Sequence, residues 1–341
     1  MFGPQIPTIN PSRGGFRGGM HTNLGKLTKY RDDYERDSND YYEKQPSYSI
    51  KPNVKIPKTH RFTKIIIFGD SFSDTGRVYK LTNKTWPIVP PYYKGRSCDA
   101  SNWVDRLTGV PTISYAYSSA TTDNNFVVGL TKMNTLPVPG VRQQIEMYLN
   151  DTSKTTIDFS STLYIFWAGG NDFIFNHSTT PVEIVNRLMN DINIILAISA
   201  KHILVFNQIP VQLVPYTLSF NQVSLFTAMT AAGNAAITGS LMNMQANFTD
   251  TSINIFNIHD LILNVTSNTT SVKFENTVSP CWIQQNLTTV NILCPDPKKY
   301  VFLDPFHFTS PVHQLIAGAI QPLLSYKYNA TSSYPYIIPL K

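Results

Sequence analysis

A chain of 341 residues with 42% hydrophobic and 12% aromatic content can bury a full core, which excludes disorder throughout its length. The formal net charge of +6 is uneven, because residues 1–60 hold ten Lys/Arg against six Asp/Glu and so carry +4. The rest of the chain is nearly neutral, so its charge does not indicate a nucleic-acid partner.

The first 60 residues contain "RGGFRGG" at 13–19 and the charge-mixed "YRDDYERDSND" at 30–40, with no apolar period. This composition predicts a disordered basic tail or linker over 1–60. The two Arg-Gly-Gly units with one Phe permit an alternative, an RNA-contacting segment, but the flexible tail is the simpler interpretation.

No run in the chain approaches the roughly 18 apolar residues of a membrane span, and no apolar core of a secretory signal is visible at the N-terminus. We therefore expect no transmembrane segment. The chain has three cysteines, Cys98, Cys281 and Cys294. Cys281 and Cys294 either close a small disulfide loop, which would imply an oxidising compartment, or remain reduced thiols. The same compartment would suit the Asn-X-Ser/Thr sites at Asn83, Asn150, Asn176, Asn247, Asn264, Asn268, Asn286 and Asn329.

From residue 61 onward, short apolar segments alternate with helix-like ones. The segments at 64–68, 112–117, 162–168, 202–207 and 253–258 are β-branched or aromatic and apolar on both faces, as buried parallel strands are. Thr180, Pro181 and Glu183 form a capping signature for a helix that follows, and further helices are predicted at about 219–246 and 310–326. This alternation predicts a doubly wound, three-layer α/β/α sandwich with a five-stranded parallel sheet, in one domain over 61–335.

Polar, small-residue turns follow the first three predicted strands: Gly69–Gly76, Ser118–Asp123 and Gly169–Asp172. In such sheets, ligands bind beyond the carboxyl ends of the strands. A serine on a tight turn after a strand, as Ser71 is, can present its hydroxyl to a pocket. We therefore expect Ser71 to be a nucleophile and Asp74 to cap the next helix.

A serine nucleophile needs a base and a group that orients the base. His307 follows Asp304 by three residues and precedes a predicted helix, so it is the candidate base and Asp304 its partner. His202 and His313 have no carboxylate near them in sequence and, like the other histidines, are interpreted as surface or structural residues. The backbone N–H groups of Ser71 and Ser119 and the side-chain amide of Asn171 are candidate oxyanion donors.

These blocks resemble the GDSL or SGNH hydrolase family of serine esterases and lipases, over about residues 62–325. "FGDSFSDTG" is similar to its nucleophile block, "AGGND" to its Gly-X-Asn-Asp block and "LDPFH" to its Asp-X-X-His block. The segments "GRSCDASNWVDRL" (95–107), "YAYSSATTDN" (115–124) and "VPGVRQQIEMYL" resemble those of the fungal and bacterial secreted branch of the family, which has plant-lipase-like relatives. The resemblance implies a flavodoxin-like SGNH hydrolase fold, a Ser71–His307–Asp304 triad and an oxyanion hole from Ser71, Ser119 and Asn171.

Three positions depart from the family pattern. Ser118-Ser119 stands where the family has Gly-Gly, and a side chain there would be strained by about 1–2 kcal/mol if the backbone needs a positive φ. Cys98-Asp99-Ala100 replaces Ser-Asn-Gly and places a thiol and a carboxylate near the expected pocket. His307-Phe308-Thr309 replaces His-Pro-Thr and is expected to alter the loop more than the imidazole.

The leading functional hypothesis is a carboxylic ester hydrolase that works through an acyl-serine intermediate. The alternatives are an acyltransferase that uses the same site and a catalytically weakened relative that binds lipids or glycans. The expected substrate is a small-molecule, lipid or acylated-carbohydrate ester, with no metal or organic cofactor, and the chain is expected to be a monomer. The family and the Asn-X-Ser/Thr sites suggest secretion, and the missing signal leaves an intracellular protein open. Aromatic candidates for pocket walls, with core packing as the alternative, are Trp86, Tyr92, Tyr93, Trp103 and Phe173.

Overall fold

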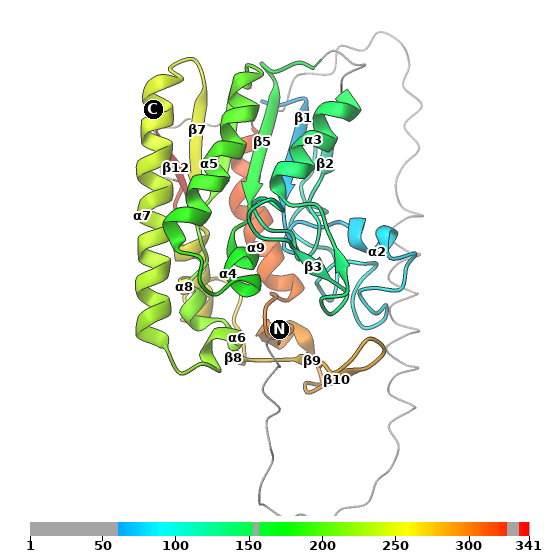
Figure 1. The fold of residues 1–341 in the computed structure, drawn as a ribbon. Coiled ribbons are helices and arrows are strands. Elements are labelled where there is room, and N and C mark those ends of the chain that lie inside the picture. Colours follow the sequence, from blue (N-terminus) through cyan, green and yellow to red (C-terminus); the bar gives the residue numbers. More distant parts are fainter. Residues whose placement is uncertain (1–60, 153–156, 326–333, 341) are drawn as a thin grey trace, which may run out of the picture. The chain divides into compact units, whose positions relative to one another are not determined.

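The computed structural model describes residues 61–152, 157–325 and 334–340, so the predicted tail at 1–60 lies outside the described residues. A six-stranded sheet with the order β12-β7-β6-β5-β1-β2 forms the centre of this part of the chain (Figure 1). Its strands are β1 (Lys64–Gly69), β2 (Thr112–Ser114), β5 (Thr162–Trp167), β6 (His202–Phe206), β7 (Ser252–Phe256) and β12 (Ile337–Pro339).

All five predicted strands are present and run parallel, which confirms the predicted fold class. The sheet also gains β12, which pairs antiparallel with β7 at one edge and lies beyond residue 335. A three-residue edge strand gives no periodic signal in the sequence, because its place depends on the strand beside it. At the other edge, β2 ends at Ser114, three residues earlier than predicted. The domain limits of 61–335 stay a prediction.

Helices cover both faces of the sheet (Figure 1). Along β1, Ile65 and Ile67 join the core beneath α8 (Ile258–Thr266) and α9 (Ser310–Ile320). Ile66 and Phe68 point to the opposite face, where α3 (Val141–Thr152), α5 (Pro181–Ala197) and α7 (Val223–Asn247) pack. Because successive side chains of a strand alternate between faces, a strand buried on both sides must be apolar at every position, as β1 is.

The connections hold shorter elements. The short helices and 3₁₀ turns are α2 (Arg77–Leu81), α4 (Gly170–Phe175), α6 (Pro215–Leu218), η1 (Val211–Leu213), η2 (Pro297–Lys299) and η3 (Gln321–Leu324). Three strand pairs lie outside the main sheet: β3 (Leu130–Thr131) with β4 (Leu136–Pro137), β9 (Trp282–Gln284) with β10 (Val290–Ile292), and β8 (Asn276–Pro280) with β11 (Tyr300–Phe302). Cys281 and Cys294 form a disulfide across the β9–β10 hairpin, which resolves the alternative left open by the sequence.

The predicted helix boundaries hold where local signals are strong. The capping box at the start of α5 is present, with the Glu183 N–H donating to Thr180 Oγ1 and the Thr180 N–H donating to Glu183 Oε2. The long helix predicted from about 219 starts instead at Val223, because Asn221 takes a left-handed backbone conformation that separates α6 from α7. No helix among the described ranges is long and apolar enough to cross a membrane.

The order of the strands places a topological switch point at β1. From β1 the chain passes to β2 on one side and then crosses to β5 on the other. The turns after β1, β2 and β5 therefore meet at the carboxyl edge of three adjacent strands, where doubly wound sheets bind their ligands.

His313 on α9 is buried in this core and accepts a hydrogen bond from the Trp103 N–H at 3.4 Å. Burial, with smaller contributions from the positive charges of Arg106 and His307, lowers the pKa of His313 to about 3. The unfolded chain takes up this proton near its ordinary pKa of about 6.5. The contribution of neutral His313 to the free energy of unfolding is therefore fully present above about pH 6.5 and is lost as the pH falls toward the folded-state pKa of about 3.

We expect His313→Gln to flatten this pH dependence. Between about pH 7 and pH 5, the free energy of unfolding should fall by roughly 2 kcal/mol less in the variant than in the parent chain. Urea denaturation of both chains across that range measures the difference. Parallel stability curves for the two chains would contradict the assignment.

Candidate active site

Ser71, His307 and Asp304 are joined directly by hydrogen bonds. His307 Nε2 lies 2.8 Å from Ser71 Oγ, and His307 Nδ1 lies 2.9 Å and 2.8 Å from the two oxygens of Asp304. The serine stands just after β1, and the other two residues lie between β11 and α9. Because Asp304 accepts from Nδ1–H, the imidazole is held in the tautomer whose Nε2 can take a proton from the serine.

The Asp304 carboxylate accepts further hydrogen bonds within its own loop and from outside it. The N–H groups of Phe306 and His307 both donate to Oδ1 at 2.9 Å, and the Tyr92 hydroxyl donates to Oδ2 at 2.7 Å. Burial opposes ionisation of Asp304, but the facing charge and hydrogen bond of His307, with the bond from Tyr92, hold the pKa of Asp304 below its ordinary value. Asp304 is therefore a carboxylate at neutral pH.

The candidate base, His307, is partly buried, and that burial alone would lower its pKa. The charge and hydrogen bond of Asp304 outweigh that effect, and with the charge of Asp70 they raise the pKa of His307 above its ordinary value. Asp70, which precedes Ser71, is 4% exposed and accepts from the Phe72 N–H. Burial raises the pKa of Asp70 to about 7, so its charge varies near neutral pH.

The turn that carries Ser71 is fixed by a close backbone approach to β5 and by hydrogen bonds from α3. A Cβ on Gly69 would lie 2.4 Å from the Trp167 carbonyl oxygen of β5, so this position requires glycine. Gln144 of α3 accepts from the Gly69 N–H and donates to the Gly69 carbonyl, at 2.9 Å and 2.8 Å. Ser71 follows this clamp on a tight turn, with the Ser73 N–H donating to the Asp70 carbonyl. The next helix, α2, starts at Arg77, three residues after Asp74, the residue predicted to cap it.

Asp74 ties the first turn to the second. Its carboxylate accepts from the N–H groups of Gly76, Arg77 and Val78, so Asp74 satisfies N–H groups at the start of α2 as predicted, although the N-cap position itself is Gly76. The same carboxylate accepts from the N–H and hydroxyl of Ser118 at 2.9 Å and 3.0 Å. Asp74 therefore positions the residue that precedes Ser119.

The turn after β5 is hydrogen-bonded to the turn after β2. Asn171 Nδ2 donates to the Ala120 carbonyl at 2.9 Å, and the N–H and hydroxyl of Thr122 both donate to the buried Asp172. An amide carries two N–H donors, so Asn171 keeps one beyond its bond to Ala120. Ser119 and Asn171 thus belong to adjoining turns, and neither is hydrogen-bonded directly to Ser71 within the described ranges.

The three departures from the family pattern have distinct structural outcomes. Ser119 has φ 73°, so the strained backbone expected there is present. Asp99 is buried and accepts from the N–H and hydroxyl of Ser310 at 2.7 Å and 3.0 Å, which fixes the start of α9 behind the His307 loop. Cys98 is fully buried and unbridged. Phe308 is fully buried, stacked on Phe72 with ring centroids 5.2 Å apart.

Tyr92 and Gln144 are site residues that the sequence reasoning missed in these roles. The sequence analysis names Tyr92 only as a candidate pocket wall, whereas its hydroxyl donates a hydrogen bond to Asp304 of the candidate triad. Gln144 lies on the buried face of α3, and a polar residue on an apolar helix face is the one signal that could have identified it. Trp103, another wall candidate, is fully buried in the core, and His202 is the first residue of β6 and is partly buried.

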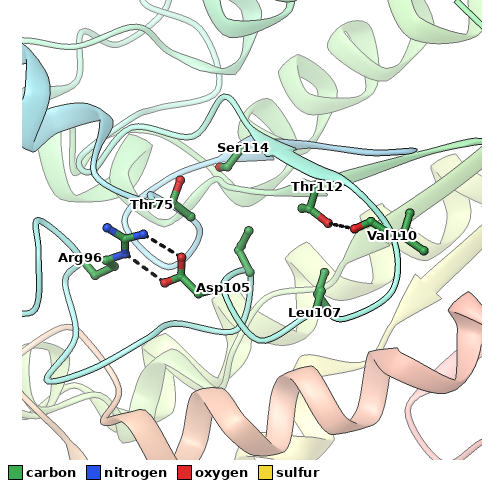
Figure 2. A pocket seen from close by; sticks show the side chains of 8 residues that line it. Thr75, Arg96, Asp105, Leu107, Val110, Thr112 and Ser114 are labelled. Carbon is green, nitrogen blue, oxygen red and sulfur yellow. Dashed lines mark hydrogen bonds and ion pairs between the residues drawn. The ribbon is translucent and has the colours of Figure 1, made fainter. Parts of the chain in front are cut away.

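A separate cavity of about 330 Å³ contains none of the predicted site residues. Its lining residues are Thr75, Arg96, Val104, Asp105, Leu107, Val110, Thr112 and Ser114 (Figure 2). Arg96 donates to both oxygens of Asp105 at 3.0 Å and 2.7 Å, so the two charged groups of this cavity neutralise each other. The cavity offers no reactive group comparable to Ser71.

Comparison with known proteins gives one family and distant relatives. The GDSL-like Lipase/Acylhydrolase family model matches residues 65–320. A phosphatidylcholine-sterol acyltransferase from Aeromonas hydrophila is 27% identical over 150 residues, covering 43% of this chain and 44% of that protein. A GDSL esterase/lipase from Arabidopsis thaliana is 25% identical over 185 residues, covering 48% of this chain and 50% of that protein. The matches to these two relatives thus span half their length or slightly less. A solved structure of a lipolytic G-D-S-L family member from Veillonella parvula has 10% identity and a TM-score of 0.41, covering 75% of this chain and 94% of that one.

The strained backbone at Ser119 gives a stability prediction. We expect Ser119→Gly to stabilise the fold by about 0.5–1 kcal/mol, because glycine adopts a positive φ without steric cost. Ser199, with φ 72° at the end of α5, is a matched control at a distance from the site, and Ser199→Gly should give a similar gain. Thermal unfolding of the three chains measures both effects. A lower midpoint for Ser119→Gly would show that the Ser119 side chain makes a compensating contribution.

Proposed function

The chain belongs to the GDSL-like lipase/acylhydrolase family, and on that premise we propose that it hydrolyses carboxylic esters through an acyl-Ser71 intermediate. One observation carries the proposal: the 2.8 Å contact between Ser71 Oγ and the Nε2 of an imidazole that Asp304 orients. A hydroxyl in that position becomes a nucleophile when the imidazole accepts its proton.

In the proposed reaction, His307 takes the proton from Ser71 while the serine oxygen attacks the ester carbonyl carbon. The carbonyl oxygen becomes an oxyanion, for which the N–H groups of Ser71 and Ser119 and the Asn171 amide are the proposed donors. Collapse of this intermediate breaks the carbon–oxygen ester bond, and the proton on His307 goes to the departing alcohol. The acid part of the ester remains bound to Ser71.

Water completes the cycle. His307, neutral again, accepts a proton from water as the water oxygen attacks the acyl-serine, and the proton then returns to Ser71 Oγ as the carboxylic acid departs. Both half-reactions need neutral His307, whose pKa is raised by Asp304 and Asp70 against the effect of burial. Activity should therefore rise with pH along a limb above the ordinary histidine value. We propose a small-molecule, lipid or acylated-carbohydrate ester as the substrate.

Acyl transfer is the second candidate function. The Aeromonas hydrophila relative is named as an acyltransferase that acts between phosphatidylcholine and sterol, which favours this alternative. The chemistry differs only in the second step, where an alcohol replaces water as the group that attacks acyl-Ser71. Product analysis with a competing alcohol separates the two functions, because only a transferase forms the new ester in abundant water.

The hydrolysis of short p-nitrophenyl esters tests the proposal. Ser71→Ala removes the attacking oxygen, so the rate constant kcat should fall by a factor of roughly 10³ or more. Ser73→Ala is the matched control, because Ser73 lies on the same turn and its buried hydroxyl has no hydrogen-bond partner among the described residues. Ser73→Ala should keep the parent's activity. Turnover that persists in Ser71→Ala would overturn the proposal.

A fluorophosphonate probe distinguishes an active site from a binding protein of the same fold. The probe should label the folded chain at Ser71 and should fail to label Ser71→Ala or heat-treated protein. A parent chain that resists labelling and hydrolyses no ester would favour the alternative of a lipid- or glycan-binding relative.

The proposed oxyanion hole gives a second kinetic prediction. Loss of one oxyanion donor should lower kcat of Asn171→Ala by about 10²–10³ with little change in KM. Asn176→Ala, five residues further along at the exposed end of α4, is the control and should match the parent. Equal kcat values for Asn171→Ala and the parent would exclude the Asn171 side chain from the oxyanion hole.

A further inference from the structure

We propose that Tyr92 is a positioning residue of this site, whose hydroxyl holds the Asp304 carboxylate that orients His307. The inference rests on the proposed function and extends it from three residues to four. Tyr92 is the first residue in a continuous chain of hydrogen bonds that runs through Asp304 and His307 to Ser71.

The contact is direct and shielded from water. The Tyr92 hydroxyl lies 2.7 Å from Asp304 Oδ2, and the two residues are 6% and 3% exposed. The N–H groups of Phe306 and His307 occupy the other oxygen, Oδ1. Tyr92 is therefore the donor at Oδ2 that comes from outside the 303–309 loop, and the two residues are separated by 212 positions in sequence.

The hydroxyl is a permanent donor. Burial, together with the charge of Asp304 and the hydrogen bond to it, raises the pKa of Tyr92 well above its ordinary value. The phenol thus keeps its proton at every pH where His307 titrates. The ionised Asp304 carboxylate can only accept hydrogen bonds, and the Tyr92 hydroxyl keeps its proton. The hydrogen bond between them therefore always runs from Tyr92 to Asp304.

Surrounding contacts hold the Tyr92 ring in place. Tyr92 packs edge-on against Trp282 of β9, with ring centroids 5.3 Å apart and an interplanar angle of 86°. Together with Cys281, Cys294 and Leu303, these two residues form one buried apolar cluster. The backbone is fixed as well, because the Tyr92 N–H donates to the Ile88 carbonyl and the Tyr93 N–H to the Cys98 carbonyl. The disulfide hairpin therefore supports the residue that supports Asp304.

The hydrogen bond has a predictable effect on the base. A donor to Asp304 Oδ2 draws negative charge away from the oxygens that face His307, so removal of the donor should raise the pKa of His307. The titratable groups that face or influence His307 are Asp304 in its own loop, Ser71 and Asp70 after β1, and His313 on α9. A Tyr92→Phe substitution leaves these groups in place and deletes one oxygen.

The test is a pH titration of His307 monitored by NMR in protein with selectively ¹³C-labelled histidine. The His307 signal is assigned by its absence from the spectrum of His307→Gln. Tyr92→Phe should raise the pKa of His307 by about 0.5–1 unit. The acid limb of kcat/KM for p-nitrophenyl ester hydrolysis should move upward by the same amount. A residue with a merely structural role would lower the unfolding midpoint and leave the titration unchanged.

Two further chains make the result decisive. Tyr148→Phe, which removes a buried hydroxyl bonded to Tyr164 at 2.8 Å on the opposite face of the sheet, should titrate as the parent does. Site-specific 3-fluorotyrosine at position 92 keeps the ring and makes the hydroxyl a stronger donor, so the pKa of His307 should fall. This second chain decides the question if Tyr92→Phe does not fold.

The outcomes separate the two proposals. An upward shift with phenylalanine and a downward shift with fluorotyrosine would support the role of Tyr92, whereas unchanged titrations in the chains that fold would overturn it. Because the NMR titration needs no substrate, it decides this point even if the parent lacks Ser71-dependent turnover. Such a lack of turnover would count against the proposed hydrolase alone.

Discussion

The Asp304 carboxylate is a buried negative charge, and the geometry of the site depends on how that charge is satisfied. A carboxylate withdrawn from water is strongly destabilising unless hydrogen-bond donors replace the water. Here the donors are two N–H groups of its own loop, the imidazole Nδ1–H of His307 and the hydroxyl of Tyr92. Each bond that stabilises the charge also fixes a position, so the same contacts that keep Asp304 ionised point His307 Nε2 at Ser71.

Other buried carboxylates connect turns that are distant in sequence by the same physics. Asp74 caps α2 and also holds Ser118, while Asp172 holds Thr122 from the turn after β5. Each carboxylate satisfies N–H groups that no strand or helix partner reaches. Asp74 joins the turn after β1 to the turn after its neighbour β2, and Asp172 joins the turn after β5 to the turn after β2, with β1 between those two strands. The strained backbone of Ser119 lies between these two attachments, so its conformation is imposed by the turns on both sides.

The residues that the sequence could identify are those whose signal is local. β1 is apolar at consecutive positions, the capping box of α5 occupies four residues, and Asp304 and His307 are three residues apart. Tyr92, Gln144 and β12 act through contacts with segments far away in sequence, and no pattern near them records those partners. The start of α7 was also misplaced, because one left-handed residue, Asn221, ended the helical pattern in a way that composition does not encode.

The departures from the family pattern near residue 98 make sense as part of the support for the His307 loop. Asp99 holds Ser310 just after that loop, and Tyr92 holds Asp304 within it, so one segment secures the loop at two points. The disulfide hairpin adds a third attachment, since the Trp282 N–H donates to the Leu303 carbonyl. In the proposed reaction, a base held this way would need little rearrangement when charge develops, and preorganised dipoles are usually the largest single contribution to catalysis. The carboxylate at position 99 therefore acts on the His307 loop through Ser310, the first residue of the helix that follows the loop.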